Sequence, residues 1–452
     1  MYCQEWGKRS GLVCDSFLKS HPVLHRILMF MTCFVLVSCG QDNRLAETPN
    51  VLLPVAQYPD KNLPNALKTT QPTIYYMTDR EPSENIKAKV PYSHERSASM
   101  ALGRQKLQFG EDLDWGELRL LSVLRHKTVV PVRAIASDEL VRFPPTPIPF
   151  VSKGGRTIPD PVIARSYATA EDAFRREIRQ ALRITPDGEV LVYIHGVNND
   201  FSRGAGTIAN LWHFSGRQAV PIVYTWPAAT PGLVGYFSDR ESSIFSIFHF
   251  KQFLTLLAKM PEVKKINIVA HSQGTALTTS ALRELIIAER AAGRNPKRSL
   301  KIETLILAAP DLNYEVFGQR FLAERFNDAF KQVTIYTSSN DYALGIAQFL
   351  FRGVRVGRVT YDDLDSIERR VLEGAPNIHI INVEAVVGRD SHSYFHNNPD
   401  VLSDIVISLR TGLPPGGEER PLEFQKGNFW NLHAGYPFDR PKTVFELERP
   451  DP

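Results

Sequence analysis

Short apolar runs alternate with helix-like segments along most of the chain. Residues 189–194 are almost continuously apolar, which is the pattern of a strand buried on both faces of a sheet. Similar runs recur at 219–225, 265–270, 304–309, 333–337 and 379–387. Apolar residues with helical spacing accompany them, notably at 168–182, 244–259 and 275–292. Strands that alternate with helices predict an α/β fold with a mostly parallel central sheet, flanked by helices on both faces.

The segments on either side of this alternating region have a different pattern. Residues 73–165 begin with a short β-rich run and continue with β-prone pieces, such as 127–133, that prolines interrupt. We expect them to supply edge strands and loops of the same sheet, with an exposed Pro- and Gly-rich loop at 144–161. The predicted domain therefore spans 73–412. Residues 413–452 are rich in Pro, Gly and aromatic residues and are expected to form a C-terminal extension, which either wraps the domain or extends from it.

Composition narrows the class of protein. The chain has 452 residues, of which 43% are hydrophobic, so it can bury a sizeable core. This excludes a chain that is mainly disordered or fibrous. The net charge is only +4, and no concentrated basic segment is present, so we expect no nucleic-acid partner.

The N-terminal 39 residues contain all four cysteines, at positions 3, 14, 33 and 39. An apolar run at 27–37 follows several basic residues; it is short for a membrane span but suits the core of a signal peptide. The sequence Leu-Val-Ser-Cys at 36–39 resembles a bacterial lipobox. That resemblance implies a signal peptide over 1–38 and a lipidated Cys39. A short buried or membrane-anchoring helix is the alternative.

The residues around Cys39 lead to an expectation about location. Gly40 follows the cysteine, which by resemblance to Gram-negative lipoproteins favours sorting to the outer membrane, facing the periplasm. Residues 39–72 are polar and contain Asn and Pro, so we expect a flexible tether between the lipid and the domain.

A serine follows one of the predicted central strands. The run at 265–270 ends in His271-Ser272-Gln273-Gly274, and a helical segment begins directly afterwards. A strand, a turn of small residues carrying a serine, and a helix make the nucleophile-elbow arrangement, although Ala270 replaces the usual first glycine. The tight turn strains the backbone at Ser272 and exposes its Oγ, while Gly274 lets the helix pack close to the strand. We predict Ser272 as a nucleophile; a helix N-cap serine is the alternative.

A second strand end carries a group of backbone donors. The run at 189–194 ends in His195-Gly196-Val197-Asn198, which resembles the oxyanion loop of α/β-hydrolases. We predict that the N–H groups of Val197 and Gln273 stabilise a developing oxyanion, at about 3 kcal/mol for each donor. Gly196 lets the backbone approach the substrate. His195 and Asn198 are expected to support the loop, with His195 as a buried brace and not as the base.

Two further strand ends supply a candidate base and a candidate acid. His392 follows the last apolar run and is predicted to accept the proton of Ser272, with His396 as its competitor. Asp341 follows the strand before it and is the favoured acid. Asp311, one strand earlier, is the alternative, because the chain order Ser, Asp, His holds with either aspartate.

These motifs resemble the α/β-hydrolase superfamily and, more narrowly, a bacterial family of α/β hydrolases of unknown function. The resemblance covers about residues 73 to 412. Its marks in this chain include Tyr-Ile-His-Gly-Val-Asn (193–198), Tyr-Thr-Trp-Pro (224–227), Ala-His-Ser-Gln-Gly (270–274), Ala-Ala-Pro-Asp-Leu (308–312), Ser-Asn-Asp-Tyr-Ala-Leu (339–344) and Ser-His-Ser-Tyr-Phe (391–395). Gln273 stands where Met is common, and Ser391 where Gly is common. The resemblance implies a Ser-His-Asp serine hydrolase without a cofactor and leaves the substrate open.

The sequence therefore predicts a serine hydrolase that cleaves carboxylic esters through an acyl-enzyme. An acyltransferase or an amidase would use the same residues, and a non-catalytic envelope scaffold is the alternative from another class. No ligand cluster at regular spacing points to a metal site. The aromatic segment at 226–253 could bind an acyl or otherwise apolar group, although ordinary helix core is the favoured explanation. The expected partners are an acyl ester or lipid-like substrate and the membrane, through Cys39; the oligomeric state is left open.

Overall fold

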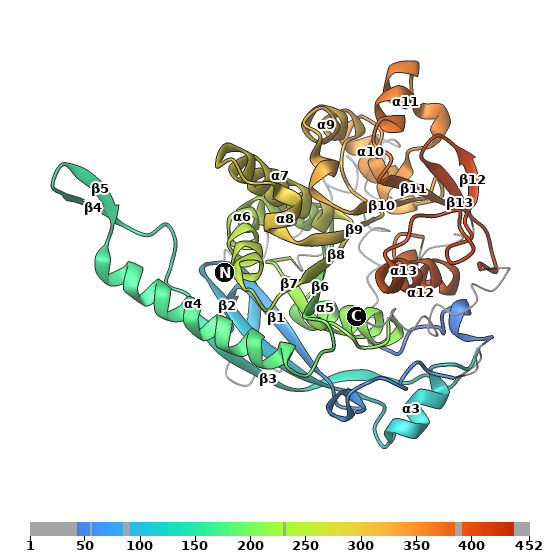
Figure 1. Ribbon diagram of the computed structural model, residues 1–452, viewed down its shortest axis with the longest axis horizontal. Helices are drawn as coiled ribbons and strands as arrows, with labels where there is room; N and C mark the ends of the chain where they lie inside the picture. The colour runs from blue at the N-terminus through green and yellow to red at the C-terminus, as the bar shows by residue number, and fades with distance from the viewer. Residues whose placement is uncertain are drawn as a thin grey trace, which may run out of the picture.

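The central feature of the computed structural model is one large sheet. The structure describes residues 43–54, 57–84, 91–125, 127–228, 232–384 and 391–437. Within them an 11-stranded sheet has the order β12-β13-β11-β10-β9-β8-β6-β7-β1-β2-β3 (Figure 1). Its strands are β1 (Thr73–Pro82), β2 (Tyr92–Phe109), β3 (Val132–Arg142), β6 (Glu189–Ile194), β7 (Val220–Thr225), β8 (Lys265–His271), β9 (Ile302–Ala308), β10 (Gln332–Thr337), β11 (Ile378–Val383), β12 (Glu423–Lys426) and β13 (Phe429–Leu432).

Most neighbouring strands run parallel. From β1 through β7, β6, β8, β9, β10 and β11 to β13, each pair is parallel, whereas β2, β3 and β12 pair antiparallel at the two ends of the sheet. The helices of the described residues are α3 (Trp115–Leu121), α4 (Pro161–Leu182), α5 (Phe201–Phe214), α6 (Gly232–Lys259), α7 (Gln273–Ala291), α8 (Pro296–Leu300), α9 (Tyr314–Phe317), α10 (Tyr342–Phe351), α11 (Ser366–Glu373), α12 (Tyr394–Asn397) and α13 (Pro399–Thr411). The predicted α/β fold with a mostly parallel sheet is confirmed.

The central strands are apolar throughout because they serve two cores. Successive side chains of a strand point to opposite faces. In β6, Val190, Val192 and Ile194 join one core, which α4, α6 and α7 cover. Leu191 and Tyr193 join the other, which α5 and α13 cover. Helices therefore lie on both faces of the sheet, as Figure 1 shows.

The strand order reverses at β6. After β6 the chain adds β7 on one side and then crosses back to add β8 on the other. In parallel α/β sheets, ligands bind outside the carboxyl ends of the strands at such a reversal. The ends of β6 and β8, followed by α5 and α7, are therefore the place where a site is expected.

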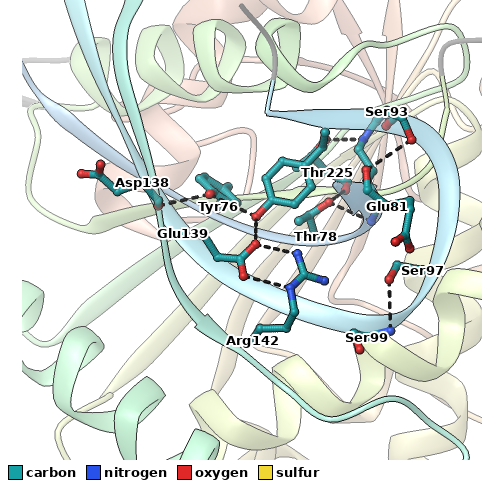
Figure 2. A network of polar contacts seen from close by, with 12 residues as sticks. Tyr76, Thr78, Glu81, Ser93, Ser97, Ser99, Asp138, Glu139, Arg142 and Thr225 are labelled. Carbon is teal, nitrogen blue, oxygen red and sulfur yellow. Dashed lines mark hydrogen bonds and ion pairs between the residues drawn. The ribbon is translucent and has the colours of Figure 1, made fainter. Parts of the chain in front are cut away.

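The edge strands β1, β2 and β3 continue the central sheet and form no separate subdomain. β1 pairs with β7, and Thr78 of β1 donates a hydrogen bond of 2.7 Å to the carbonyl of Thr225. Figure 2 shows the polar contacts around these strands, including the hydroxyl of Tyr76 that donates to the carbonyl of Asp138 at 3.1 Å. β3 begins at the end of the β-prone piece at 127–133 and continues to Arg142; its side chains are mostly exposed, so its apolar signal is weak.

The segment expected to be an exposed loop, 144–161, contains a hairpin. Strands β4 (Phe150–Lys153) and β5 (Arg156–Pro159) pair antiparallel. The hairpin projects from the body beyond the first turns of α4 (Figure 1). The side chains of its four-residue strands are largely exposed, so it has little of the apolar alternation that marks a strand.

Most of the segment that we expected to be a flexible tether is packed against the domain. Its described residues, 43–54 and 57–72, bury Leu45, Leu52 and Tyr58 in the core that α5 and α13 cover. The expectation of a tether is wrong for these residues. Their apolar side chains come in short groups, such as Val51-Leu52-Leu53, separated by polar residues and prolines, so the sequence shows no helical or strand periodicity there. The predicted signal peptide and Cys39 lie outside the described residues.

Two further observations concern the membrane and the C-terminus. Among the helices of the described ranges, none is both long and apolar enough to cross a bilayer. The described part of the C-terminal extension, 413–437, adds β12 and β13 to the sheet beside β11.

Candidate active site

Ser272 sits on a strained turn between β8 and α7. Its backbone angles are φ 53° and ψ −126°, a region that residues other than glycine rarely adopt and that costs about 1–3 kcal/mol. The turn also requires close packing. A Cβ added to Gly274 would lie 2.4 Å from the carbonyl oxygen of His195, and one added to Gly196 would lie 2.8 Å from the Cβ of Ser272. Glycine is therefore the residue that fits at both positions.

Three predicted residues form a continuous series of hydrogen bonds. The Oγ of Ser272 lies 2.8 Å from Nε2 of His392, and Nδ1 of His392 lies 2.7 Å from Oδ2 of Asp341. They come from the β8–α7 turn, the loop before α12 and the residue that caps α10. The second carboxylate oxygen of Asp341 accepts from the Leu344 amide at 3.0 Å. This N-cap bond fixes the carboxylate in the orientation that His392 meets.

Burial and neighbouring charges shift the pKa of His392 in opposite directions. Ser272 is 3% exposed and Asp341 is fully buried, while the His392 side chain is 21% exposed. Burial lowers the pKa of His392, but the charge and hydrogen bond of Asp341, with a further contribution from the charge of Asp311, outweigh it. The net pKa of His392 is raised above its usual value. A histidine held in this way is a good proton acceptor near neutral pH.

The alternative acid, Asp311, lies in a different cluster. The Tyr236 hydroxyl of α6 donates a hydrogen bond to Asp311, and Nε of Arg355 lies 3.5 Å from its other oxygen. Its own amide donates to the carbonyl of Ser272 at 3.3 Å. Of the two candidate acids, Asp341 is the one that contacts His392. Asp311 acts on His392 through its charge. Its hydrogen bonds also connect α6 with the turn that carries Ser272.

The two predicted oxyanion donors follow neighbouring strands at the same offset. Ile194 and Ala270 are paired in the ladder between β6 and β8, and Val197 and Gln273 each lie three residues beyond that pair. Gln273 opens α7, so its amide belongs to the first turn, where amides have no acceptor within the helix. Positive potential at a helix start favours a negative oxygen there.

Helix α6 holds this region in place. The amide of Asn198, whose φ is 52°, donates to the carboxylate of Asp239 at 2.8 Å. The side-chain amide of Gln273 donates to the Ser243 hydroxyl at 2.9 Å. Both sides of the oxyanion region are therefore bonded to the same helix, which fixes their separation.

His195 and His396 have environments unlike that of His392. His195 is fully buried and stacks on Trp226, with ring centroids 5.2 Å apart, and burial together with nearby Arg80 lowers its pKa to about 3. It stays neutral and braces the loop. Burial also lowers the pKa of His396 to about 4, and its ring packs edge-on against Phe395.

His271 is a residue of the site to which the sequence reasoning assigned no role. Its Nε2 donates to the carbonyl of His392 at 2.9 Å, and its ring stacks on Phe395 at 4.6 Å. Burial, and then the neighbouring His392, lower its pKa well below the usual value, so it is neutral. His271 thereby fixes the loop that carries His392. The sequence feature that could have identified His271 as a site residue is its position next to Ser272 in the motif.

The fold and this geometry define an α/β hydrolase, and comparison with known families identifies which one. The model of the family described as alpha/beta hydrolase of unknown function (DUF900) matches residues 170–410, more than half of the chain. The chain belongs to this family. No curated protein matches it. Within the described residues, no group of three or more His, Cys, Asp or Glu side chains is arranged to hold a metal ion.

Proposed function

We propose that this protein is a serine hydrolase that cleaves carboxylic esters with Ser272 as its nucleophile. The observation that carries the proposal is the series of hydrogen bonds from Ser272 through His392 to Asp341, at 2.8 and 2.7 Å, on a strained turn at a reversal of strand order. The same constellation of groups recurs in serine hydrolases on unrelated folds, where geometry and role identify it.

The proposed reaction has two halves. Ser272 Oγ attacks the ester carbonyl carbon while Nε2 of His392 takes the hydroxyl proton, and the amides of Val197 and Gln273 stabilise the oxyanion. The C–O bond to the alcohol breaks as His392 returns the proton to the leaving oxygen. Water then attacks the acyl-enzyme, His392 takes the water's proton, and Ser272 recovers it as the carboxylic acid leaves. Asp341 holds the imidazole and stabilises its charged form throughout.

Labelling with a fluorophosphonate probe tests the nucleophile. The wild-type protein is expected to label, and Ser272→Ala and His392→Ala to lose the label, because phosphonylation requires an activated serine. Matched controls are Ser166→Ala on exposed α4 and His94→Ala, whose side chain is 55% exposed. Labelling of Ser272→Ala, or no labelling of a wild-type protein with a native circular dichroism spectrum, would count against the proposal.

We also propose that Cys39 carries a lipid that anchors the protein to the outer membrane, facing the periplasm. The support is the lipobox-like sequence before Cys39 and the glycine after it. The expected result is that Cys39→Ala leaves the membrane fraction and no longer incorporates labelled fatty acid. Fatty-acid labelling of the Cys39→Ala chain would exclude this anchor.

A further inference from the structure

An exposed apolar surface borders the site at the start of α6 and along α10. Its members are Val234, Phe237, Tyr342, Phe349, Leu350 and the half-buried Phe351, and we call it the apolar rim. Val234 is 80% exposed and Phe349 is 83% exposed. Single exposed apolar residues are ordinary on soluble proteins, but a joined group of large ones marks an interaction site.

The two helices that carry the apolar rim contact each other, and the rim adjoins the reacting groups. The ring of Phe351 lies 5.5 Å from that of Tyr236 and 5.6 Å from that of Phe237, so it joins α10 to α6. Tyr342 directly follows Asp341, and Tyr236 is bonded to Asp311. What docks on this surface is therefore brought next to Ser272.

The composition of α10 is unusual for a surface helix. Its ten residues, Tyr-Ala-Leu-Gly-Ile-Ala-Gln-Phe-Leu-Phe, include no charged side chain, and only Leu344 and Ala347 are buried. Surface helices normally place charged residues on the face that meets water. An exposed helix without charges is better suited to the boundary between lipid headgroups and acyl chains.

Cationic side chains border the apolar rim. The Arg240 guanidinium carbon lies 4.4 Å from the centre of the Phe351 ring, and exposed Arg352 follows α10 directly. Arginine beside exposed aromatic and aliphatic groups matches an anionic lipid surface, where it pairs with phosphate while the apolar groups enter the interface. A symmetric pairing with a second copy of the chain would instead bring the same arginines together.

We infer that the apolar rim docks on an anionic phospholipid bilayer and that the ester cleaved at Ser272 is a lipid of that bilayer. The substrate half of this inference rests on the proposed function, whereas the docking half does not. Docking positions the carboxyl edge of the sheet against the membrane, so an acyl ester can move from the bilayer to Ser272 without crossing water.

The docking half is tested by a local readout on the full chain. Phe349→Trp introduces an indole in the apolar rim, and Phe150→Trp introduces one in the β4–β5 hairpin, where Phe150 is 65% exposed. Each is mixed with vesicles of phosphatidylglycerol and phosphatidylcholine that carry bromine on the acyl chains. Emission attributable to the indole of Phe349→Trp is expected to be quenched, and that of Phe150→Trp is not. An unquenched indole at position 349 overturns docking.

The substrate half is tested by comparing two esters. The double variant Phe349→Ser/Leu350→Ser is assayed against Phe150→Ser/Val162→Ser, whose residues are 65% and 63% exposed on the hairpin and at the start of α4. The ratio of hydrolysis of a long-chain ester in vesicles to that of a soluble acetate ester is expected to fall at least about tenfold in the first variant only, because two large apolar contacts with the bilayer are lost. Equal ratios overturn the lipid substrate.

Three other outcomes are distinguishable. If the indole of Phe349→Trp is quenched but no ester, soluble or vesicular, is cleaved, the docking stands and the proposed function fails. If soluble esters are cleaved but the indole is not quenched, the proposed function stands and the inference fails. If wild type sediments as a dimer that Phe349→Ser/Leu350→Ser dissociates, and vesicles cause no quenching, a second copy covers the apolar rim and the inference is overturned.

Discussion

At the scale of single residues, two carboxylates influence His392 from different distances. Asp341 contacts its Nδ1 at 2.7 Å, whereas Asp311 acts by charge alone. Under the proposed function, Asp341→Asn should lower kcat by about 10³–10⁴-fold, because the amide favours the wrong tautomer of the imidazole. Asp311→Asn should cause a much smaller loss. Steady-state kinetics on a soluble ester measures both.

The pH dependence of kcat/KM is a second way to compare Asp341→Asn with Asp311→Asn. His392 must be neutral to act as a base, so kcat/KM should rise as pH increases through its pKa, which is raised above the usual value. Removing either negative charge lowers that pKa and moves the rise to lower pH, further for Asp341→Asn than for Asp311→Asn. A larger loss of kcat and a larger shift with Asp311→Asn would instead identify Asp311 as the acid.

The sequence predicted the residues of this site that follow strand ends, but it assigned no role to those that reach the site from α6. Ser272 comes directly after β8, and Asp341 and His392 lie in the connections that follow β10 and β11; parallel strands bring such positions to one edge. Asp239 and Ser243 contact the site from the first half of α6, and the sequence reasoning assigned neither of them a role. Their approach depends on how that helix packs, which local patterns do not encode.

At the scale of elements, the strands that are buried on both faces of the sheet were the easiest to predict from the sequence. The central strands were recognised because both their faces are covered. Helix α5 was missed, although apolar residues with helical spacing lie at positions 201, 205, 208, 209 and 212 and nearly all of its residues are buried. It also contains Gly204 and Gly206, which lower helix propensity. A Cβ at Gly204 would lie 2.9 Å from a Val223 methyl group, so packing explains why a poor helix former stands there.

Helix α7 packs closely against the end of β6 because residue 274 is a glycine, which has no side chain. Gly274→Ala would place a Cβ 2.4 Å from the carbonyl oxygen of His195 and 2.9 Å from that of Ile194. Both are backbone atoms, so α7 must shift. We expect a loss of about 1–3 kcal/mol in the free energy of unfolding, measured by urea titration.

Gly318→Ala is the matched control for this substitution. Gly318 is helical, with φ −57°, and a Cβ there meets nothing within 4 Å. It should be neutral or slightly stabilising, because alanine reduces the freedom of the unfolded chain. Equal stability of the two variants would show that α7 can move away from β6 without cost.

At the scale of the whole molecule, both described ends of the chain complete the core that α5 and α13 cover. Leu52 and Tyr58 enter it from the N-terminal side, and Tyr436 enters it from the C-terminal extension. The N-terminal contribution was not predicted, because short apolar groups between polar residues and prolines carry no periodic signal, whereas wrapping of the domain was one of two expectations for the C-terminal extension. The long-range contacts that bury them arise only once the sheet and its helices are assembled.

A buried ion pair fastens the C-terminal extension to the domain. The Arg420 guanidinium donates two hydrogen bonds to Asp404 of α13, at 2.9 and 2.8 Å, and both side chains are fully buried. The hydroxyls of Tyr336 and Tyr436 donate to the same carboxylate at 2.6 and 2.9 Å. A strand of the domain (β10), helix α13 and the extension therefore share one charged centre.

Arg420→Met should remove about 3–5 kcal/mol from the free energy of unfolding, because it leaves the Asp404 carboxylate buried without its cation. Arg420→Met/Asp404→Leu should be less destabilised than the single variant, since neither charge then remains. Arg175→Met, which removes a partly exposed partner of Glu171 on α4, should cost less than about 1 kcal/mol. Urea titrations of the four proteins measure these differences. If the double variant is less stable than Arg420→Met, the tyrosine hydroxyls alone satisfy Asp404, and the extension is held by packing and not by charge.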